Sequence, residues 1–240
     1  MIIITVKKHG LKPKKNKFFI NLRNLKYSFL NTLFKKSISK YNASFFIRYF
    51  YDVIDDVLMD FRKKNNINID CKINCDWCCY LRTTATSAEI FHLVRHIKSS
   101  FSTLDVLELI ERAKLSSNLA ENKNATNHHE KNIPCSLLKN GRCEAYEARP
   151  LACRMHHSTD ENICQRDFEL PHTYYDTPTE YSSLVLANSY IISLFNKVLR
   201  SRKPSINKYE INQALLKAIE NPALEKLWLE GQDVFKDNET

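Results

Sequence analysis

The cysteines are the feature that most constrains how this chain can fold. All eight lie between positions 71 and 164, and the flanking segments contain none. Four are clustered within nine residues and four are spread over a longer stretch: Cys71, Cys75, Cys78 and Cys79, then Cys135, Cys143, Cys153 and Cys164. Thiolates are soft ligands that suit zinc and iron–sulfur centres. We therefore expect this segment to be organised by what its thiols bind.

The rest of the sequence indicates a cytoplasmic location. At 240 residues the chain is long enough to bury a core without the help of disulfides. Its apolar start, residues 1–6, precedes the basic run, whereas a secretory signal carries its charge first. No stretch reaches the roughly 18 uninterrupted apolar residues of a membrane span, so we expect no transmembrane segment. In a reducing compartment, clustered cysteines indicate metal more often than disulfides.

The positive charge of the chain is concentrated at its beginning. The net charge is +9, and residues 1–50 carry 12 Lys and Arg but no Asp or Glu. Such a segment could bind an anionic partner: nucleic acid, a membrane surface or an acidic protein. The alternative is the solvated basic face of an ordinary helix.

Apolar residues recur at intervals of three and four along most of the chain, which predicts a mainly α fold. The expected helices cover about 46–62, 87–98, 102–119, 180–200 and 209–219, with a last one starting at Pro222. The run Thr86-Ser-Ala-Glu89 has the pattern of a capping box. The polar stretch 122–132, which contains His128 and His129, is expected to be an exposed loop.

The second group of cysteines lies in a stretch of little periodicity. Residues 134–164 contain Pro134, Gly141 and Pro150, so we expect irregular chain there with few and short strands. The predicted fold is a set of helices around an irregular, cysteine-rich core stapled by metal. Its expected parts are a basic arm and helices over 1–65, a metal-binding domain over 66–170, and helices packing on it over 171–240.

The spacing of the first cluster suits metal binding. Cys75 and Cys78 are separated by two residues, which lets two sulfurs face one ion from a turn, and Cys71 could supply a third. Cys78 and Cys79 are adjacent and point in different directions, so one of them could serve a second metal or face substrate. The later cysteines are too far apart in the sequence to bind one ion from a single short turn, and they are expected to join ligands from the first cluster. The competing interpretations are small buried hydrophobic residues and disulfides.

This pattern resembles the YkgJ-type cysteine-cluster family, which is described as a putative zinc- or iron-chelating domain. Cys75-Asp-Trp-Cys78-Cys79 matches the core of the C-x-x-C-x-x-C-C motif, and Cys135-Ser-Leu-Leu is similar to the second family segment. Gly141-Arg-Cys143-Glu-Ala-Tyr146-Glu-Ala-Arg149-Pro150-Leu-Ala-Cys153-Arg154 closely matches the third, and Cys164 supplies the last thiol. Three positions depart from the pattern: Cys71 lies one residue further from Cys75, Pro134 precedes Cys135, and Ala145 replaces an Ile.

The resemblance implies a metal-binding protein that holds zinc or iron ions, or an iron–sulfur cluster. Flagellin lysine N-methylases are similar in their cysteine pattern, so an enzyme of that kind is the first alternative. No glycine-rich methyl-donor loop is visible, because the chain has only three Gly. A nucleic-acid or membrane-binding module led by residues 1–50 is the second alternative.

Four residues near the third motif are expected to support the metal site. Arg149 and Arg154 could balance thiolate charge, hold an anionic substrate, or fix the loop through a carbonyl or an ion pair. Tyr146 is expected to pack, and His156 could act as a nitrogen ligand.

Overall fold

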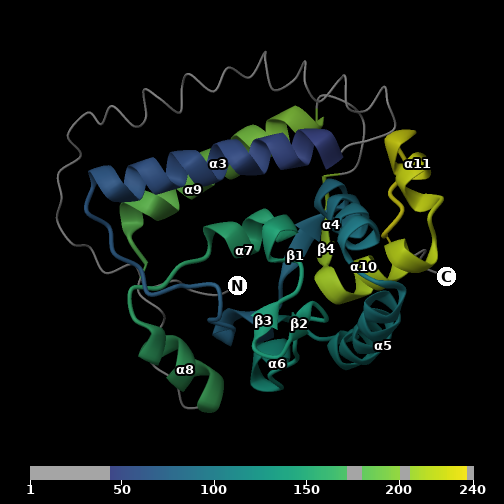
Figure 1. Ribbon diagram of the computed structural model, residues 1–240, viewed down its shortest axis with the longest axis horizontal. Coiled ribbons are helices and arrows are strands. Elements are labelled where there is room, and N and C mark those ends of the chain that lie inside the picture. The colour runs from purple at the N-terminus through teal and green to yellow at the C-terminus, as the bar shows by residue number, and fades with distance from the viewer. Residues whose placement is uncertain (1–43, 172–179, 201–205, 237–240) are drawn as a thin grey trace.

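The structure of the chain, a computed structural model, describes residues 44–171, 180–200 and 206–236. Over these residues the protein is mainly helical with two small antiparallel sheets, which confirms the predicted mainly α class (Figure 1). The α-helices are α3 (Ser44–Lys64), α4 (Ser87–Ser100), α5 (Thr103–Ala120), α6 (Ala125–Glu130), α7 (Leu151–Met155), α8 (Glu161–Glu169), α9 (Ser182–Arg200), α10 (Ile211–Glu220) and α11 (Leu224–Leu229).

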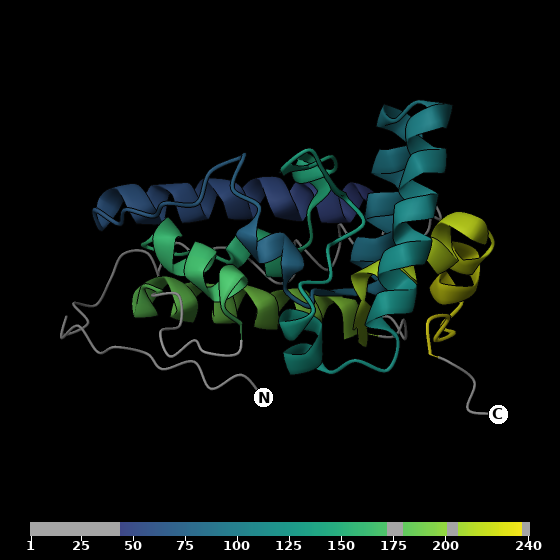
Figure 2. The ribbon, with the colours of Figure 1, turned by 90° about the horizontal axis from the view of Figure 1, so that it is seen from below.

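Helices α3 and α9 lie side by side and pack through aromatic rings (Figures 1 and 2). Phe46 and Phe50 project from one face of α3, four residues apart, and both contact Phe195 of α9. The ring centroids are 6.2 Å and 5.0 Å from that of Phe195. All three side chains are almost fully buried, so the apolar stripe predicted for α3 does face a core.

Among the described helices, α9 is long and apolar enough to cross a membrane. Core helices pass the same test. Here Ile191, Phe195 and Val198 of α9 are buried in the core.

A second group of helices packs around α10. Helix α10 contacts both α5 and α4, and the strand before it, β4 (Lys208–Glu210), pairs with β1 (Thr84–Thr86) ahead of α4. The register aligns Ala85 with Tyr209. Because β1 and β4 lead directly into α4 and α10, this two-stranded ladder fixes the start of both helices.

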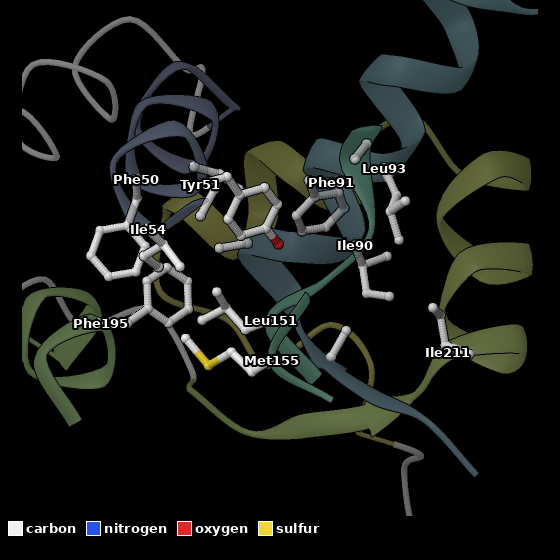
Figure 3. Packing of buried hydrophobic residues seen from close by; sticks show 14 of the residues in the cluster. Phe50, Tyr51, Ile54, Ile90, Phe91, Leu93, Leu151, Met155, Phe195 and Ile211 are labelled. Carbon is white, nitrogen blue, oxygen red and sulfur yellow. The ribbon is translucent and has the colours of Figure 1, made fainter. Parts of the chain in front are cut away.

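Glu89 links three helices in the middle of the core. Its carboxylate, 3% exposed, accepts hydrogen bonds from the Thr86 backbone N–H and hydroxyl (2.9 and 2.8 Å), completing the predicted capping box of α4. It also accepts from the Tyr51 hydroxyl of α3 (3.1 Å) and from the Leu151 N–H at the start of α7 (2.8 Å). In Figure 3, Tyr51 lies in the same cluster as Leu151 and Met155 of α7. One carboxylate thus joins α7, which carries Cys153, to the two core helices.

The cysteine-rich stretch is built from short elements. They are two 3₁₀ turns, η1 (Trp77–Tyr80) and η2 (Tyr146–Ala148), the hairpin strands β2 (Leu138–Lys139) and β3 (Arg142–Cys143), and helices α7 and α8. Asn140 and Gly141 connect the strands with positive φ angles of 52° and 73°, the conformation of a type I′ turn. The expectation of few and short strands is therefore confirmed for this segment, whereas α7 and the first turn of α8 are regular helix where irregular chain was expected.

The prediction of an exposed loop over 122–132 is wrong. Residues 125–130 form α6, which Asn124 caps by accepting from the Asn127 N–H. His128 is 1% exposed, and its Nε2 contacts the Ile133 carbonyl oxygen at 3.1 Å. The composition of this stretch is polar, but a single helical turn places His128 inward against the chain that leads to Cys135.

Candidate metal centre

The eight thiols come from six separate parts of the chain. Cys71 and Cys75 lie in the loop between α3 and η1, and Cys78 and Cys79 lie on η1. The remaining four are carried by the segment before β2, by β3, by α7 and by α8: Cys135, Cys143, Cys153 and Cys164. All eight are described and all are free thiols, of which Cys71 is exposed and the other seven are partly buried.

The loop that carries Cys71 is fastened to the segment that leads into α8. The Asp70 N–H donates to the Ser158 carbonyl oxygen (3.0 Å), and the Ser158 N–H donates to the Cys71 sulfur (3.2 Å). The Glu161 N–H donates to the Asp70 carboxylate (3.2 Å), and Lys72 forms an ion pair with Glu161 (2.6 Å). These contacts hold two segments, almost 90 residues apart in the sequence, against each other.

Cys78 and Cys164 line the same small cavity between η1 and α8. The two elements are in contact, and the ring of Phe168 on α8 packs against Trp77 (5.4 Å) and Tyr80 (4.6 Å) of η1. The Cys164 thiol donates to the Asp160 carbonyl oxygen one turn earlier (3.8 Å). Helix α8 therefore directs Cys164 toward the first cysteine cluster.

A different set of contacts surrounds Cys79. The Cys135 N–H donates to the Cys79 carbonyl oxygen (2.8 Å), which joins η1 to the segment before the hairpin. The Leu138 N–H donates to the Cys135 carbonyl oxygen (2.9 Å), and Leu138 pairs with Cys143 across the hairpin. The hairpin thus brings Cys143 back toward Cys135, and α7 follows with Cys153.

Burial makes most of these thiols reluctant to ionise. It raises the pKa of Cys75 to about 11 and that of Cys135 to about 12, where the charge of Cys143 adds to the effect. Burial also raises the pKa of Cys153 well above its ordinary value, and the charges of Cys135, Cys78 and Cys143 raise it further. The exception is Cys78, whose pKa is lowered by a hydrogen bond with Cys79. A bound cation would offset both burial and repulsion, since thiols bind metal as thiolates.

Arg149 provides positive charge beside the thiols. Its guanidinium lies over the Tyr146 ring, 3.7 Å from the centroid, and donates to the Tyr146 carbonyl oxygen (2.8 Å). Its charge acts to lower the pKa of Cys78, Cys143 and Cys153. Both readings of Arg149 from the sequence, a fixed loop and charge balance, are compatible with this position.

Arg154 has a buried side chain, which is held in place by contacts with neighbouring side chains and backbone. Its side chain, 3% exposed, forms an ion pair with Asp55 of α3, donates to the Glu147 carbonyl oxygen and lies 4.3 Å from the centre of the Tyr51 ring. Asp55 lies on α3, so this ion pair connects that helix to the end of α7.

The two adjacent histidines after Arg154 differ in their surroundings. His157 is buried, with Nδ1 against the Met155 carbonyl oxygen (3.2 Å) and Nε2 accepting from the Tyr181 N–H (3.1 Å). Both of its nitrogens are therefore engaged. His156 lines the cavity that Cys78 and Cys164 share. Of the pair, His156 is the one that lines this cavity, and its role as a nitrogen ligand stays a prediction.

Sequence reasoning missed polar groups on the far side of the same cavity. His129 and Asn132 of the α6 region and Asp167 of α8 also line it. His129 Nε2 lies 3.2 Å from the Asp167 carboxylate, and this hydrogen bond raises the pKa of His129. Its Nδ1 has no hydrogen-bond partner among the described residues. The pair His128-His129 was visible in the sequence, but nothing there indicated the contact with Asp167.

The thiols lie in neighbouring segments, but they are not arranged around a common point. Among the residues that the structure describes, no three His, Cys, Asp or Glu side chains are arranged to hold a metal ion. A cysteine side chain has a single torsion with three staggered positions, so its sulfur can be redirected without moving the backbone. Most of the basic stretch 1–50, as well as 172–179, lies outside the described residues. Comparisons with models of known families, with curated proteins and with solved structures found no match.

Proposed function

We propose that this protein binds metal through its clustered cysteines, and that the metal is zinc or iron, either as ions or within an iron–sulfur centre. The observation that carries the proposal is that thiols from the 71–79 loop, the β2–β3 hairpin, α7 and α8 occupy one connected region. Direct backbone bonds join its parts, as between Cys135 and Cys79 and between Asp70 and Ser158. Free thiols scattered as core residues would need no such links between distant segments.

The chemistry of the donor set fits these metals. Eight thiols with a nearby imidazole, that of His156, form a soft ligand set that suits zinc and iron–sulfur centres. Free thiols are also the state expected in a reducing cytoplasm, where we place the protein. The resemblance of residues 75–79 and 141–154 to a putative metal-chelating family points the same way.

A bound metal would supply cross-links between short elements and neutralise the thiolates. The chain's own residues prepare the region for it. Glu89 fixes the start of α7, the Asn140-Gly141 turn sets the hairpin, and Lys72 with Glu161 fastens the first loop to α8. Arg149 contributes a positive charge next to three of the thiols. Binding energy at such a site becomes folding energy for the segments it joins.

The test is metal analysis and an absorption spectrum of protein purified without oxygen. We expect bound zinc in colourless protein, or iron with sulfide in brown protein. The Cys135→Ser, Cys153→Ser double variant should lose metal and become susceptible to protease between residues 120 and 165. Met155→Leu, a volume-conserving change on the same helix as Cys153, is the matched control and should keep its metal. Unchanged metal content and protease resistance in the double variant would overturn the proposal.

A further inference from the structure

We propose that a polar cleft between β4, α10 and the end of α5 binds a small molecule that carries a phosphate group. The cleft has a volume of about 600 Å³, within the range of about 300–1,000 Å³ that is typical of small-molecule sites. None of the described residues that line it is a cysteine, so this site is separate from the thiols and from the proposed metal binding. Its charge and its unpartnered hydrogen-bond donors point to the ligand.

The walls of the cleft come from segments that are distant in the sequence. Strand β4 pairs with β1, and the Ile211 N–H donates to the Thr83 carbonyl oxygen (3.0 Å), which holds the neighbouring Arg82 near the start of α10. Helix α10 also contacts α5, whose last turn carries Ser117 (Figure 1). The strand pair and the helix pair therefore fix the backbone around the cleft before any ligand binds.

Arg82 and Ser117 bring donors to the cleft that lack a partner. The Nε of Arg82 and the Oγ of Ser117 are both buried, and neither has a hydrogen-bond partner within the described part of the chain. Ser117 as a whole is 8% exposed. Because buried polar atoms are nearly always hydrogen-bonded, such atoms at a cleft indicate a water or a ligand that supplies the acceptor.

The charges of the cleft favour an anion over water. Its lining contains three cationic side chains, those of Arg82, Lys208 and Lys217, and two carboxylates, those of Glu121 and Glu210. A phosphate group carries a charge of about −1.5 to −2 near pH 7, whereas a carboxylate carries one negative charge. Three cations therefore match a phosphate better, and a planar guanidinium can bind two phosphate oxygens at once.

The carboxylate of Glu210 is already used by the start of α10. Its Oε2 accepts from the Gln213 N–H and its Oε1 accepts from the Asn212 side-chain amide, both at 2.9 Å. Glu210 is 4% exposed, and burial raises its pKa, so its negative charge opposes a bound anion less. The other carboxylate, that of Glu121, lies on an exposed residue just after α5. The guanidinium of Arg82 thus remains available to a ligand.

Two aromatic rings also line the cleft. The ring centroids of Tyr209 and Phe235 are 5.2 Å apart, and Phe235 is buried. A planar apolar group attached to the phosphate could pack on these rings. The cleft therefore fits a phosphate ester with a planar organic part better than inorganic phosphate.

The experiment is isothermal titration calorimetry of the full-length protein with phenyl phosphate, inorganic phosphate and benzoate. We expect phenyl phosphate to bind one-to-one with a Kd below about 1 mM, more tightly than inorganic phosphate and at least about tenfold more tightly than benzoate. Absence of phenyl phosphate binding overturns the proposal. Benzoate binding of equal strength also overturns it, because the cleft would then not select a phosphate.

Variants test whether the phosphate binds in the cleft. Arg82→Gln, Lys208→Gln removes two of its cations, and Lys98→Gln, Lys131→Gln removes the same charge from exposed positions outside it, as the matched control. We expect the first variant to weaken phenyl phosphate binding at least about tenfold and the control to stay within about twofold of the wild type. If the first variant binds as the wild type does, the phosphate is held elsewhere and the proposal is wrong.

A measurement on the wild type covers the case of a misfolded variant. Phenylglyoxal modifies arginine side chains, and peptide mass spectrometry reports which of them have reacted. Saturating phenyl phosphate should slow the modification of Arg82 at least about threefold and leave that of the exposed Arg48 of α3 unchanged. An Arg82 that phenyl phosphate does not protect, or equal protection of both arginines, overturns the proposal.

Discussion

Replacing Glu89 tests whether one buried carboxylate holds α3, α4 and α7 together. It accepts four hydrogen bonds, two from Thr86 and one each from Tyr51 and Leu151, at 2.8 to 3.1 Å. Hydrogen bonds to a charged group contribute about 1.5–3 kcal/mol each, but burying the carboxylate costs several kcal/mol in return. Glu89→Ala leaves these buried donors without their acceptor, and an unsatisfied buried donor costs about 1–3 kcal/mol. We expect the variant to lower the free energy of unfolding by about 3–5 kcal/mol in total, since some donors will reach another acceptor.

The assay is urea unfolding followed by circular dichroism and by tyrosine and tryptophan fluorescence. For a slope of about 2–3 kcal/mol per molar urea, the midpoint should fall by about 1–2 M. Tyr51→Phe removes a single donor of the four and should cost only about 1 kcal/mol, which makes it the matched control. A Glu89→Ala variant within 1 kcal/mol of the wild type would refute the reasoning, because the four bonds would then contribute no more than solvation does.

Three further predictions concern other contacts of the core. Phe195→Ala should cost about 3–5 kcal/mol in urea unfolding, because it removes the ring that packs on both Phe46 and Phe50; a loss below 1 kcal/mol would contradict the packing described. Arg154→Lys keeps the charge but loses the planar contacts, so unfolding should show a loss of about 1–2 kcal/mol, while an unchanged midpoint would argue against them. Burial lowers the pKa of His92 to about 4, so its share of stability is complete above the unfolded pKa of about 6.5 and is lost as pH falls toward 4. The difference in midpoint between pH 7 and pH 4.5 should therefore be smaller in His92→Gln than in the wild type, and equal differences would refute this.

The sequence predicts the helices well because their apolar spacing is a local property. The stripe of α3 and the capping box of α4 depend on residues within one or two turns, and both are found where expected. The Asn140-Gly141 pair is also a local hairpin signal, although only its glycine entered the prediction.

The arrangement of the candidate site depends on contacts between distant segments, which no local pattern reveals. Cys164 lies on the same side of η1 as Cys78 because the Asp70 N–H is hydrogen-bonded to the Ser158 carbonyl oxygen and because the Phe168 ring packs on Trp77. His128 is buried because α6 turns it toward the Ile133 carbonyl. All other residues of 122–132 are exposed or half-buried, as the polar composition of the stretch predicts.

Simultaneous counting of thiols and metal tests the central claim most directly. A thiol-specific mercurial reagent is added stepwise to the native protein, while a chromogenic chelator reports the metal set free. If the thiols hold metal, release should follow modification in proportion, at about four thiols for each single-ion centre, and should be complete when all eight cysteines have reacted. If all eight thiols react and no metal appears, the cysteines hold none, and the account given for them is wrong.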